Sequence, residues 1–376
     1  MENPKKIKVL FLIHDLGHGG AEKVLVNLVN NMDQTKFDIS LIALFGGGVN
    51  EQYLKPSIHY RAVFASTFRG NIHIMKLLTP RQIHKRVIKE HYDIEVSYLE
   101  GPSARIISGC PDSATKLVSW IHIEQNGAKQ SARSFRSVRE AVNCYNRFDT
   151  LVGVSETVRS SFLSVLPIDP PMQVLYNTNE SAKILDQAQT PVDSGLFSDA
   201  EIKLVGVGKL LKSKGFDRMA RLVKRLTDEQ YPIHLYILGV GPLQKELELY
   251  IAENHLEHRI TLLGYQTNPY KYVAKCDLFV CASHAEGFST AATEALIVGT
   301  PVCTVEVSGM KEMLGEHDEW GIVTENNDEA LYQGIKRLLD DPSLLAHYKE
   351  KATQRGKTFS TENTVKAVEE MLLSLS

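Results

Sequence analysis

The sequence predicts an α/β protein built from two domains, each a parallel sheet flanked by helices. Short apolar runs alternate with segments of helical periodicity along the whole chain, and this alternation is typical of strands joined by crossover helices. The chain has 376 residues, 43% of them hydrophobic, which is more than one hydrophobic core usually serves. We therefore expect two domains of ordinary size with a cleft between them.

The first expected domain covers residues 1–180. It opens with a buried apolar strand, Ile7–Ile13, which is followed by a loop and by an amphipathic helix, Ala21–Asn31. Later apolar runs predict strands at Phe37–Leu44, Ile94–Leu99, Lys116–Ile121, Thr150–Val154 and Gln173–Tyr176.

The second expected domain covers residues 201–355. Residues 181–200 are polar and lack a clear period, so we place a linker there. Amphipathic helices are expected at Phe216–Leu226 and Leu243–Ile251. Strands are expected at Ile202–Val207, Ile233–Leu238, Ile260–Leu262, Asp277–Ala282, Pro301–Val305 and Gly321–Val323.

Composition restricts the partners and the compartment. The formal net charge is -3, from 42 basic and 45 acidic residues, whereas a nucleic-acid-binding protein would show a basic excess. Five cysteines without a C-x-x-C pair favour a reducing compartment. No apolar stretch approaches the roughly 20 residues of a membrane span. We expect a cytoplasmic protein that does not bind nucleic acid.

Basic residues outnumber acidic ones in the first half of the chain. The residues between 69 and 89 interleave these charges with apolar side chains, as a helix lying on anionic lipid would. Solvated helical faces explain the same pattern equally well. Peripheral binding to the inner face of the cell membrane is therefore one of two expectations.

A phosphate site is the first functional expectation. Residues 206–217 follow a predicted strand and open a helix, and they combine glycines with Lys209, Lys212 and Lys214. Flexible backbone and cations at a helix N-terminus suit a diphosphate. An ordinary turn with solvated lysines is the alternative, and the spacing excludes a P-loop.

A pair of glutamates forms the second functional expectation. Glu286 lies in the loop after a predicted strand, and Ser289 is placed to cap the helix that follows. Glu294 lies just past the first turn of that helix, so its side chain leans back toward the helix start. Helix amides can hold phosphate oxygens and the carboxylates can accept hydrogen bonds from sugar hydroxyls. A solvated surface glutamate is the alternative.

These motifs, in this order, resemble the family-four retaining glycosyltransferases of the GT-B fold. The resemblance rests on Glu-x(7)-Glu from Glu286 to Glu294, on Lys209 with Lys214-Gly215-Phe216-Asp217, and on the turn Gly239-Val240-Gly241-Pro242. It implies two Rossmann-like domains, with the C-terminal segment 356–376 forming a helix that returns to the first. The sequence is most similar in style to bacterial enzymes that build capsule, exopolysaccharide or lipopolysaccharide.

The resemblance also implies roles for individual residues. Lys209 and Lys214 would hold the diphosphate. The family more often has Arg at the position of Lys209, and an arginine binds phosphate with two parallel hydrogen bonds. Glu294 would bind the ribose, and Glu286 would act at the donor sugar. The other implied donor-binding residues are Gly241, Tyr265 near the base, Gly287, Phe288, Ser289 and Thr290.

Two sites in the first domain complete this set. The loop containing Gly19 and Gly20 lacks the G-x-G-x-x-G spacing of a dinucleotide fold, which argues against a nicotinamide cofactor. The resemblance places its backbone near the donor phosphate or the acceptor, and a tight turn is the alternative. It places His122, at the end of a strand, near the reacting sugar as a catalytic residue, whereas a lone histidine is commonly structural.

The sequence contains no Asp-x-Asp pair that could hold a metal-bound diphosphate. We therefore expect no metal and no cofactor, with lysines and helix amides neutralising the leaving group. The resemblance implies retaining transfer from a nucleotide sugar, most simply a UDP-sugar, to a hydroxyl of a glycan or lipid-linked acceptor. A nucleotide-sugar epimerase and a non-catalytic nucleotide-sugar-binding subunit remain as alternatives.

Overall fold

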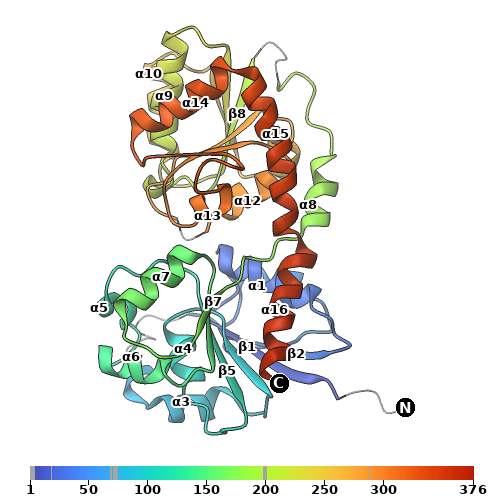
Figure 1. Cartoon of the computed structure of the whole chain (residues 1–376), viewed down its shortest axis with the longest axis vertical. Helices are drawn as coiled ribbons and strands as arrows, with labels where there is room; N and C mark the ends of the chain where they lie inside the picture. The colour runs from blue at the N-terminus through green and yellow to red at the C-terminus, as the bar shows by residue number, and fades with distance from the viewer. Residues whose placement is uncertain (1–4, 18, 68–69, 71–74, 198–200, 287) are drawn as a thin grey trace. The chain divides into compact units, whose positions relative to one another are not determined.

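The computed structural model of the chain describes residues 5–17, 19–67, 70, 75–197, 201–286 and 288–376. The chain divides into two compact units, one formed by Met1–Asn179 with Thr361–Ser376 and one formed by Glu180–Ser360. Each unit is a parallel sheet flanked by helices (Figure 1). The prediction of two parallel-sheet, Rossmann-like domains is confirmed.

The first unit contains a seven-stranded sheet in the order β3-β2-β1-β4-β5-β6-β7. Its central strands are buried, which explains why they appear in the sequence as continuous apolar runs. The strands are β1 (Ile7–Ile13), β2 (Phe37–Phe45), β3 (His59–Phe64), β4 (Ile94–Ser97), β5 (Lys116–Ile121), β6 (Thr150–Gly153) and β7 (Met172–Val174). The helices are α1 (Gly20–Asn31), α3 (Pro80–Val87), α4 (Pro102–Ile107), α5 (Ala128–Ser131), α6 (Val138–Tyr145), α7 (Glu156–Val165) and α16 (Thr361–Leu375).

The second unit contains a six-stranded parallel sheet in the order β10-β9-β8-β11-β12-β13. Its strands are β8 (Ile202–Val207), β9 (Ile233–Leu238), β10 (Ile260–Gly264), β11 (Leu278–Cys281), β12 (Val302–Val305) and β13 (Ile322–Thr324). Its helices are α8 (Ser181–Ala188), α9 (Phe216–Asp228), α10 (Gln244–Glu253), α11 (Tyr270–Val273), α12 (Thr290–Ile297), α13 (Met310–Leu314), α14 (Asp328–Asp340) and α15 (Pro342–Gly356).

Strand β3 and helix α8 depart from the organisation expected from the sequence. Strand β3 forms the edge of the first sheet beside β2, and its side chains are mostly exposed, so it shows no apolar run. Helix α8 begins the segment 181–200, where we expected a linker without regular structure. It packs against α11 and α12 and buries Ile184 and Ala188. Only two buried positions in eight residues make a weak period.

The C-terminal helix α16 belongs to the first unit, as the resemblance implied. It packs against α1 and buries Val365, Val368, Met371 and Leu372. The backbone N–H of Asp33, just after α1, donates to a carboxylate oxygen of its Glu369 at 2.5 Å. The first unit is therefore made from two segments that are far apart in the sequence.

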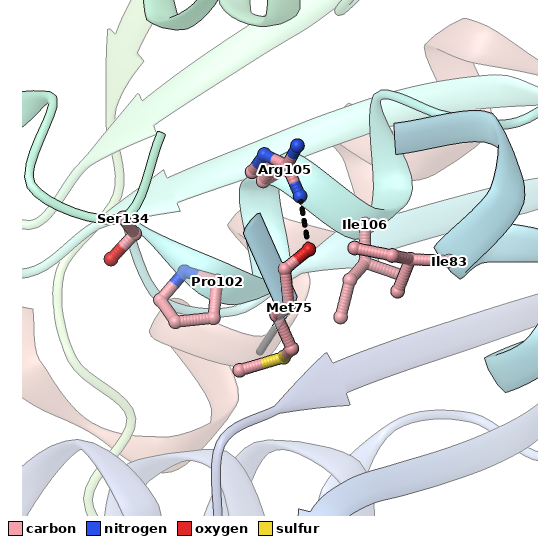
Figure 2. Close-up of a pocket in the computed structure, with 6 residues that line it drawn as sticks. All are labelled: Met75, Ile83, Pro102, Arg105, Ile106 and Ser134. Atoms are coloured by element: carbon pink, nitrogen blue, oxygen red, sulfur yellow. Dashed lines mark hydrogen bonds between the residues drawn. The ribbon is translucent and has the colours of Figure 1, made fainter. Parts of the chain in front are cut away.

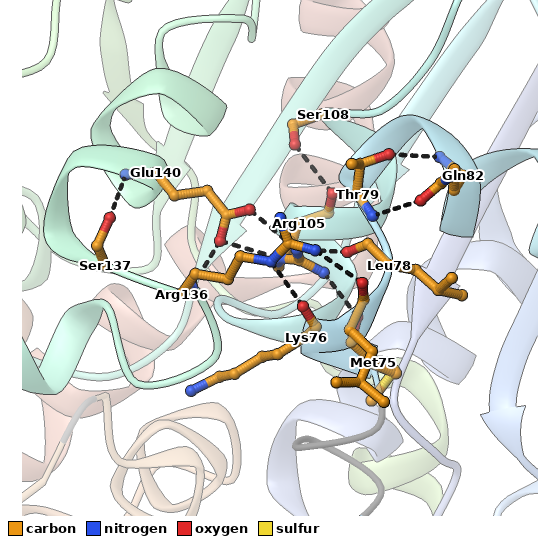
Figure 3. A network of polar contacts seen from close by, with 11 residues as sticks. Met75, Lys76, Leu78, Thr79, Gln82, Arg105, Ser108, Arg136, Ser137 and Glu140 are labelled. Atoms are coloured by element: carbon orange, nitrogen blue, oxygen red, sulfur yellow. Dashed lines mark hydrogen bonds and ion pairs between the residues drawn. The ribbon is translucent and has the colours of Figure 1, made fainter.

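Two arginines hold the short helical segment that precedes α3 (Figure 3). Arg105 donates to the carbonyl oxygens of residues 75 and 78 at 3.0 and 2.8 Å, and Arg136 donates to those of residues 76 and 77 at 2.6 and 2.8 Å. The last carbonyls of a helix lack partners within it, so the two guanidinium groups act as its C-terminal cap. Arg105 is buried and also pairs with Glu140 at 2.9 Å.

A small cavity lies beside Arg105 (Figure 2). Its volume is about 10 Å³, and its lining consists of Met75, Ile83, Pro102, Arg105, Ile106 and Ser134. This volume holds about one water molecule, so the cavity is a packing defect and does not hold a ligand.

Across the described ranges, no helix is both long enough and apolar enough to cross a bilayer. All five cysteines are free and buried.

Candidate active site

In the second sheet the order of the strands reverses between β8 and β11, which are neighbours. Open parallel sheets bind ligands at the carboxyl ends of the strands at such a point. The loops that follow these two strands meet, because the backbone N–H of His284 donates to the carbonyl oxygen of Ser213 at 2.7 Å. The structure therefore brings the loop that carries Lys214 and the loop that carries Glu286 together.

Lys214 and Glu286 form a direct ion pair at this point. The Lys214 Nζ lies 2.6 and 2.8 Å from the two carboxylate oxygens of Glu286, and the Ser283 hydroxyl donates to one of these oxygens at 2.7 Å. The Glu286 side chain is only 9% exposed and that of Lys214 is 31% exposed. Glu286 thus holds the ammonium group at the edge of the site, and a third N–H of Lys214 remains to bind an anion.

Gly215 explains why glycine follows this lysine. Its φ angle is +67°, and a Cβ atom on it would lie 2.0 Å from the carbonyl oxygen of Ala282. Only glycine fits both the left-handed backbone and the close approach to the end of β11. The turn Lys212–Lys214 can therefore pack directly against the loop that carries Glu286.

Helix α12 presents its N-terminus to the same edge. The Ser289 hydroxyl accepts a hydrogen bond from the Ala292 N–H at 3.3 Å, which confirms that Ser289 is its N-cap. Thr290 is the first helical residue, so its N–H is among those without a helical partner. The carboxylate of Glu294 accepts a hydrogen bond from the Tyr270 hydroxyl at 3.0 Å, and Tyr270 thereby orients it.

The remaining predicted donor residues differ in their surroundings. The Phe288 ring is buried, with its centroid 5.9 Å from that of Phe359, so its side chain belongs to the core. Lys209 is exposed in the loop after β8, and Tyr265 is 72% exposed after β10. Gly287 lies outside the described residues.

Gly241 has a packing role. A Cβ atom on it would lie 2.5 Å from the carbonyl oxygen of Leu210. The Leu210 N–H donates to the carbonyl oxygen of Val240 at 3.0 Å. Gly241 therefore allows the loop after β9 to support the loop after β8.

Arg218 is a site residue that we did not expect from the sequence. It lies on α9 and is 4% exposed, and its guanidinium lies 3.0 Å from Nδ1 of His284, 2.9 Å from Oδ1 of Asn326 and 2.8 Å from Oδ1 of Asp328. It therefore positions the loop that carries Glu286 from behind. The sequence did offer a signal for Arg218, because this basic residue falls among the apolar, buried positions of the amphipathic helix α9.

His122 lies at the carboxyl end of β5 in the first unit. Its ring centroid is 4.8 Å from that of Tyr98, and its backbone N–H donates to Glu100 at 3.0 Å. Burial lowers the pKa of His122 to about 3. Within the described part of the chain its Nε2 is buried without a hydrogen-bond partner. His122 is therefore a neutral imidazole, which can take part in a hydrogen bond but carries no charge.

This pKa predicts a pH dependence of stability. The unfolded chain binds a proton on His122 below its ordinary pKa of 6.5, whereas the folded chain does not until about pH 3. The free energy of unfolding should therefore fall as the pH falls from 6.5, by about 1.4 kcal/mol per pH unit from this group. Urea unfolding of His122→Gln at pH 7 and pH 5 should show a smaller loss than the wild type, and an equal loss would contradict the assignment.

The two predicted glycines at the start of α1, Gly19 and Gly20, differ in the space around their Cα atoms. Gly19 is the N-cap residue, and a Cβ atom on it would lie 1.9 Å from a carboxylate oxygen of Glu22. The Glu22 carboxylate therefore folds back over the helix start, where its negative charge is favourable. A Cβ atom on Gly20 would meet nothing within 4 Å, so the backbone there is open to a ligand.

Among the described residues, one group of His, Cys and acidic side chains is close enough to share a metal ion. It consists of His84, Glu95 and Cys110, all buried in the first unit. His84 Nε2 lies 2.8 Å from Glu95, and the Cys110 thiol lies 3.8 Å from the same carboxylate. Lys214 and Glu286, in the second unit, are not part of this group.

Two units, each a parallel sheet flanked by helices, are the architecture of GT-B glycosyltransferases. The family model described as Glycosyltransferase Family 4 matches residues 18–178, and the one described as Glycosyl transferases group 1 matches residues 191–355. The chain belongs to these glycosyltransferases.

Relatives align along nearly the whole chain. The N-acetylgalactosamine-N,N'-diacetylbacillosaminyl-diphospho-undecaprenol 4-alpha-N-acetylgalactosaminyltransferase of Campylobacter jejuni is 29% identical over 94% of this chain and 95% of its own. The lipopolysaccharide core biosynthesis glycosyltransferase LpsD of Rhizobium meliloti is 24% identical over 96% of each. The structure of Anabaena HepE with UDP and glucose aligns with a TM-score of 0.75 at 20% identity, over 98% of this chain and 100% of its own.

Proposed function

We propose that this glycosyltransferase moves a sugar from a nucleotide-diphosphate sugar to a hydroxyl of a glycan or lipid-linked acceptor. The preferred donor in this proposal is a UDP-sugar, and the transfer retains the anomeric configuration. The process it serves is bacterial surface polysaccharide synthesis. The observation that carries the proposal is the Lys214–Glu286 pair beside the capped start of α12 at the switch point. The names of the Campylobacter and Rhizobium relatives and the UDP in HepE support the substrate classes.

The site suits the departure of a nucleoside diphosphate. Negative charge grows on the diphosphate as its bond to the sugar breaks, and preorganised cations and amides stabilise that charge more than the starting state. Lys214 is held by Glu286, and the first amides of α12 point away from the helix. We propose that these groups support the leaving diphosphate without a metal or another cofactor.

The remaining residues fit the rest of the donor. Glu294, oriented by Tyr270, would accept hydrogen bonds from the ribose, and Glu286 would contact the sugar. The acceptor hydroxyl would then attack from the face that the diphosphate leaves, through an oxocarbenium-like state, so that configuration is retained without a covalent intermediate. His122, as a neutral imidazole of the first unit, would offer a hydrogen bond to a sugar hydroxyl.

The experiment that tests the proposal is a donor screen. Thermal shift and hydrolysis are measured with UDP-, GDP-, ADP- and dTDP-sugars, with and without EDTA, and the anomeric configuration of the transfer product is read by NMR. We expect one donor to raise the melting temperature with or without EDTA, and the product to keep the donor's configuration. Inverted configuration, or activity lost with EDTA, would overturn the corresponding part of the proposal.

Two variants locate the donor. Glu294→Gln should weaken donor binding about tenfold or more, because a hydrogen bond to a charged group is lost. Glu248→Gln is the matched control, because Glu248 is exposed on α10 and accepts a hydrogen bond from Gln244 of the same helix. Equal effects of the two variants would remove Glu294 from the site.

Product formed from donor alone, with the nucleotide still attached, would identify an epimerase. Donor binding without turnover on any acceptor would identify a binding subunit.

We also propose that the protein binds peripherally to anionic membranes. The exposed face of α3 carries Arg81, Lys85 and Arg86, and the preceding Leu77 is 77% exposed. Basic and apolar side chains of this kind favour an anionic lipid surface. Sedimentation with anionic vesicles but not with neutral ones is expected, and equal sedimentation would overturn the proposal.

A further inference from the structure

A histidine, a glutamate and a cysteine meet in the interior of the first unit. His84 lies on α3, Glu95 is the second residue of β4, and Cys110 follows α4. Their ligand atoms all lie within 4.8 Å of one another, and none of the three residues is more than 5% exposed. The thiol of Cys110 also interacts with the side chain of His84. The three side chains are therefore in mutual contact and come from three different parts of the unit.

Hydrogen bonds alone leave the buried carboxylate of Glu95 poorly satisfied. One of its oxygens lies 2.8 Å from Nε2 of His84. Among the described residues, the other oxygen has only the Cys110 thiol as a partner, at 3.8 Å. A thiol is a weak donor, whereas a buried carboxylate normally requires strong partners. This second oxygen is therefore placed to bind a cation.

The surrounding structure holds the three side chains in place. Glu95 lies in a central strand, which pairs with β1 on one side and with β5 on the other. A Cβ atom on Gly109 would lie 2.1 Å from the carbonyl oxygen of Pro80, so glycine lets the loop before Cys110 pack against the start of α3. Arg147 donates to the Cys110 carbonyl oxygen at 3.0 Å and fixes the same loop. Ligands that are positioned in advance reduce the cost of binding.

The ligand types and their spacing suit zinc. Zn²⁺ binds cysteine sulfur at about 2.3 Å and histidine nitrogen or carboxylate oxygen at about 2.0–2.2 Å, so a tetrahedral site separates its ligand atoms by about 3.3–3.6 Å. The observed separations of 2.8 and 3.8 Å lie on either side of this range, and small side-chain rotations reach it. A thiolate, a carboxylate and a neutral imidazole around Zn²⁺ have no net charge. The ion can therefore be buried here without an uncompensated charge.

We propose that His84, Glu95 and Cys110 bind a structural zinc ion. The Cys110 sulfur, Nε2 of His84 and a carboxylate oxygen supply the ligand atoms, and protons on the sulfur and on Nε2 pass to solvent as the metal binds. The carbonyl oxygen of Asp112, 3.7 Å from the thiol, offers a fourth ligand. Because Glu95 lies near the amino end of β4, the ion ties α3 and the loop after α4 to the sheet. It is separate from the diphosphate, for which the proposed function uses no metal.

The test measures zinc in the full-length protein, purified without a metal-affinity step. The protein is dialysed against zinc and then against buffer, its zinc content is measured by plasma mass spectrometry, and affinity is measured by competition with a chromophoric chelator. We expect about one zinc ion per wild-type chain. Cys110→Ser should weaken zinc binding by more than the roughly 10–100-fold that loss of an outer partner of a metal ligand costs. Removing zinc should lower the melting temperature of the wild type and leave that of Cys110→Ser unchanged.

Cys144→Ser is the matched control, because Cys144 is also a buried cysteine of the first unit and, within the described chain, lies outside this group. It should bind zinc as the wild type does. If Cys110→Ser does not fold, Co²⁺ added to the wild type decides, because tetrahedral thiolate-bound cobalt gives intense visible absorption and a thiolate charge-transfer band. A wild type without zinc, a Cys110→Ser variant that keeps it, or cobalt without these bands would overturn the inference.

The outcome is independent of the proposed function. An effect of EDTA on donor binding that persists in Cys110→Ser would belong to the donor site. An effect of EDTA on melting temperature that disappears in this variant would belong to the zinc site.

Discussion

Replacing Lys214 with alanine is expected to lower kcat/KM of transfer about 10²–10³-fold, which is the cost of removing one preorganised group from a developing negative charge. The substitution also leaves the Glu286 carboxylate, only 9% exposed, without its cationic partner, while the Ser283 hydroxyl still donates to it. An unpaired carboxylate there would repel the diphosphate. Initial rates over a range of donor concentrations, with the acceptor held constant, measure the effect.

Lys212 is the matched control, because it belongs to the same short turn. Its side chain is 83% exposed, and its Nζ lies 3.8 Å from Glu246, away from Glu286. Lys212→Ala should change kcat/KM less than about twofold, since exposed ion pairs contribute little. A similar loss in both variants would show that the general positive charge of the loop matters, and would contradict a specific role for Lys214.

Replacing Arg105 with methionine is expected to lower the free energy of unfolding of the first unit by about 3–5 kcal/mol, the usual cost of breaking a buried ion pair by removing one partner. The change leaves Glu140 without this partner and removes the donors that bind the carbonyl oxygens of residues 75 and 78, in the segment before α3 (Figure 3). Trp120 is buried in the first unit and Trp320 lies in the second. Urea unfolding followed by fluorescence in a Trp320→Phe background therefore reports the first unit.

Arg136 offers a direct comparison, because it caps the two carbonyls between those that Arg105 binds. It is exposed, so water can replace its hydrogen bonds. Arg136→Met should cost about 1 kcal/mol or less. If both variants lost the same stability, the burial of Arg105 would not be the reason for its effect.

Much of the fold could be predicted because its central strands are buried on both faces. The bounds of β1, β5, β8 and β9 agree with the prediction residue for residue. Such strands appear as continuous apolar runs. Strand β3 could not be found in this way, since an exposed edge strand has no such run. Very short helices such as α11, with four residues, are also too brief to show a period.

The candidate site was predictable in its parts and not in its contacts. Glu286, Glu294 and Lys214 belong to local motifs, and the N-cap role of Ser289 follows from its position before a helix. The pairing of Lys214 with Glu286 joins residues 72 positions apart, and it depends on β8 and β11 being neighbours in the sheet. Arg218 was missed because a charged residue in an amphipathic helix usually faces water, although its place among the buried positions of α9 was a signal.

The two-segment construction of the first unit has a consequence for how the protein is made. Residues 180–360 form a continuous unit that contains no residue after 360, so its folding does not depend on residues 361–376. The first unit, although translated first, must wait for α16 to cover its surface at α1. A premature stop codon that removes only the last 16 residues would therefore damage the unit encoded at the start of the gene and leave the other intact.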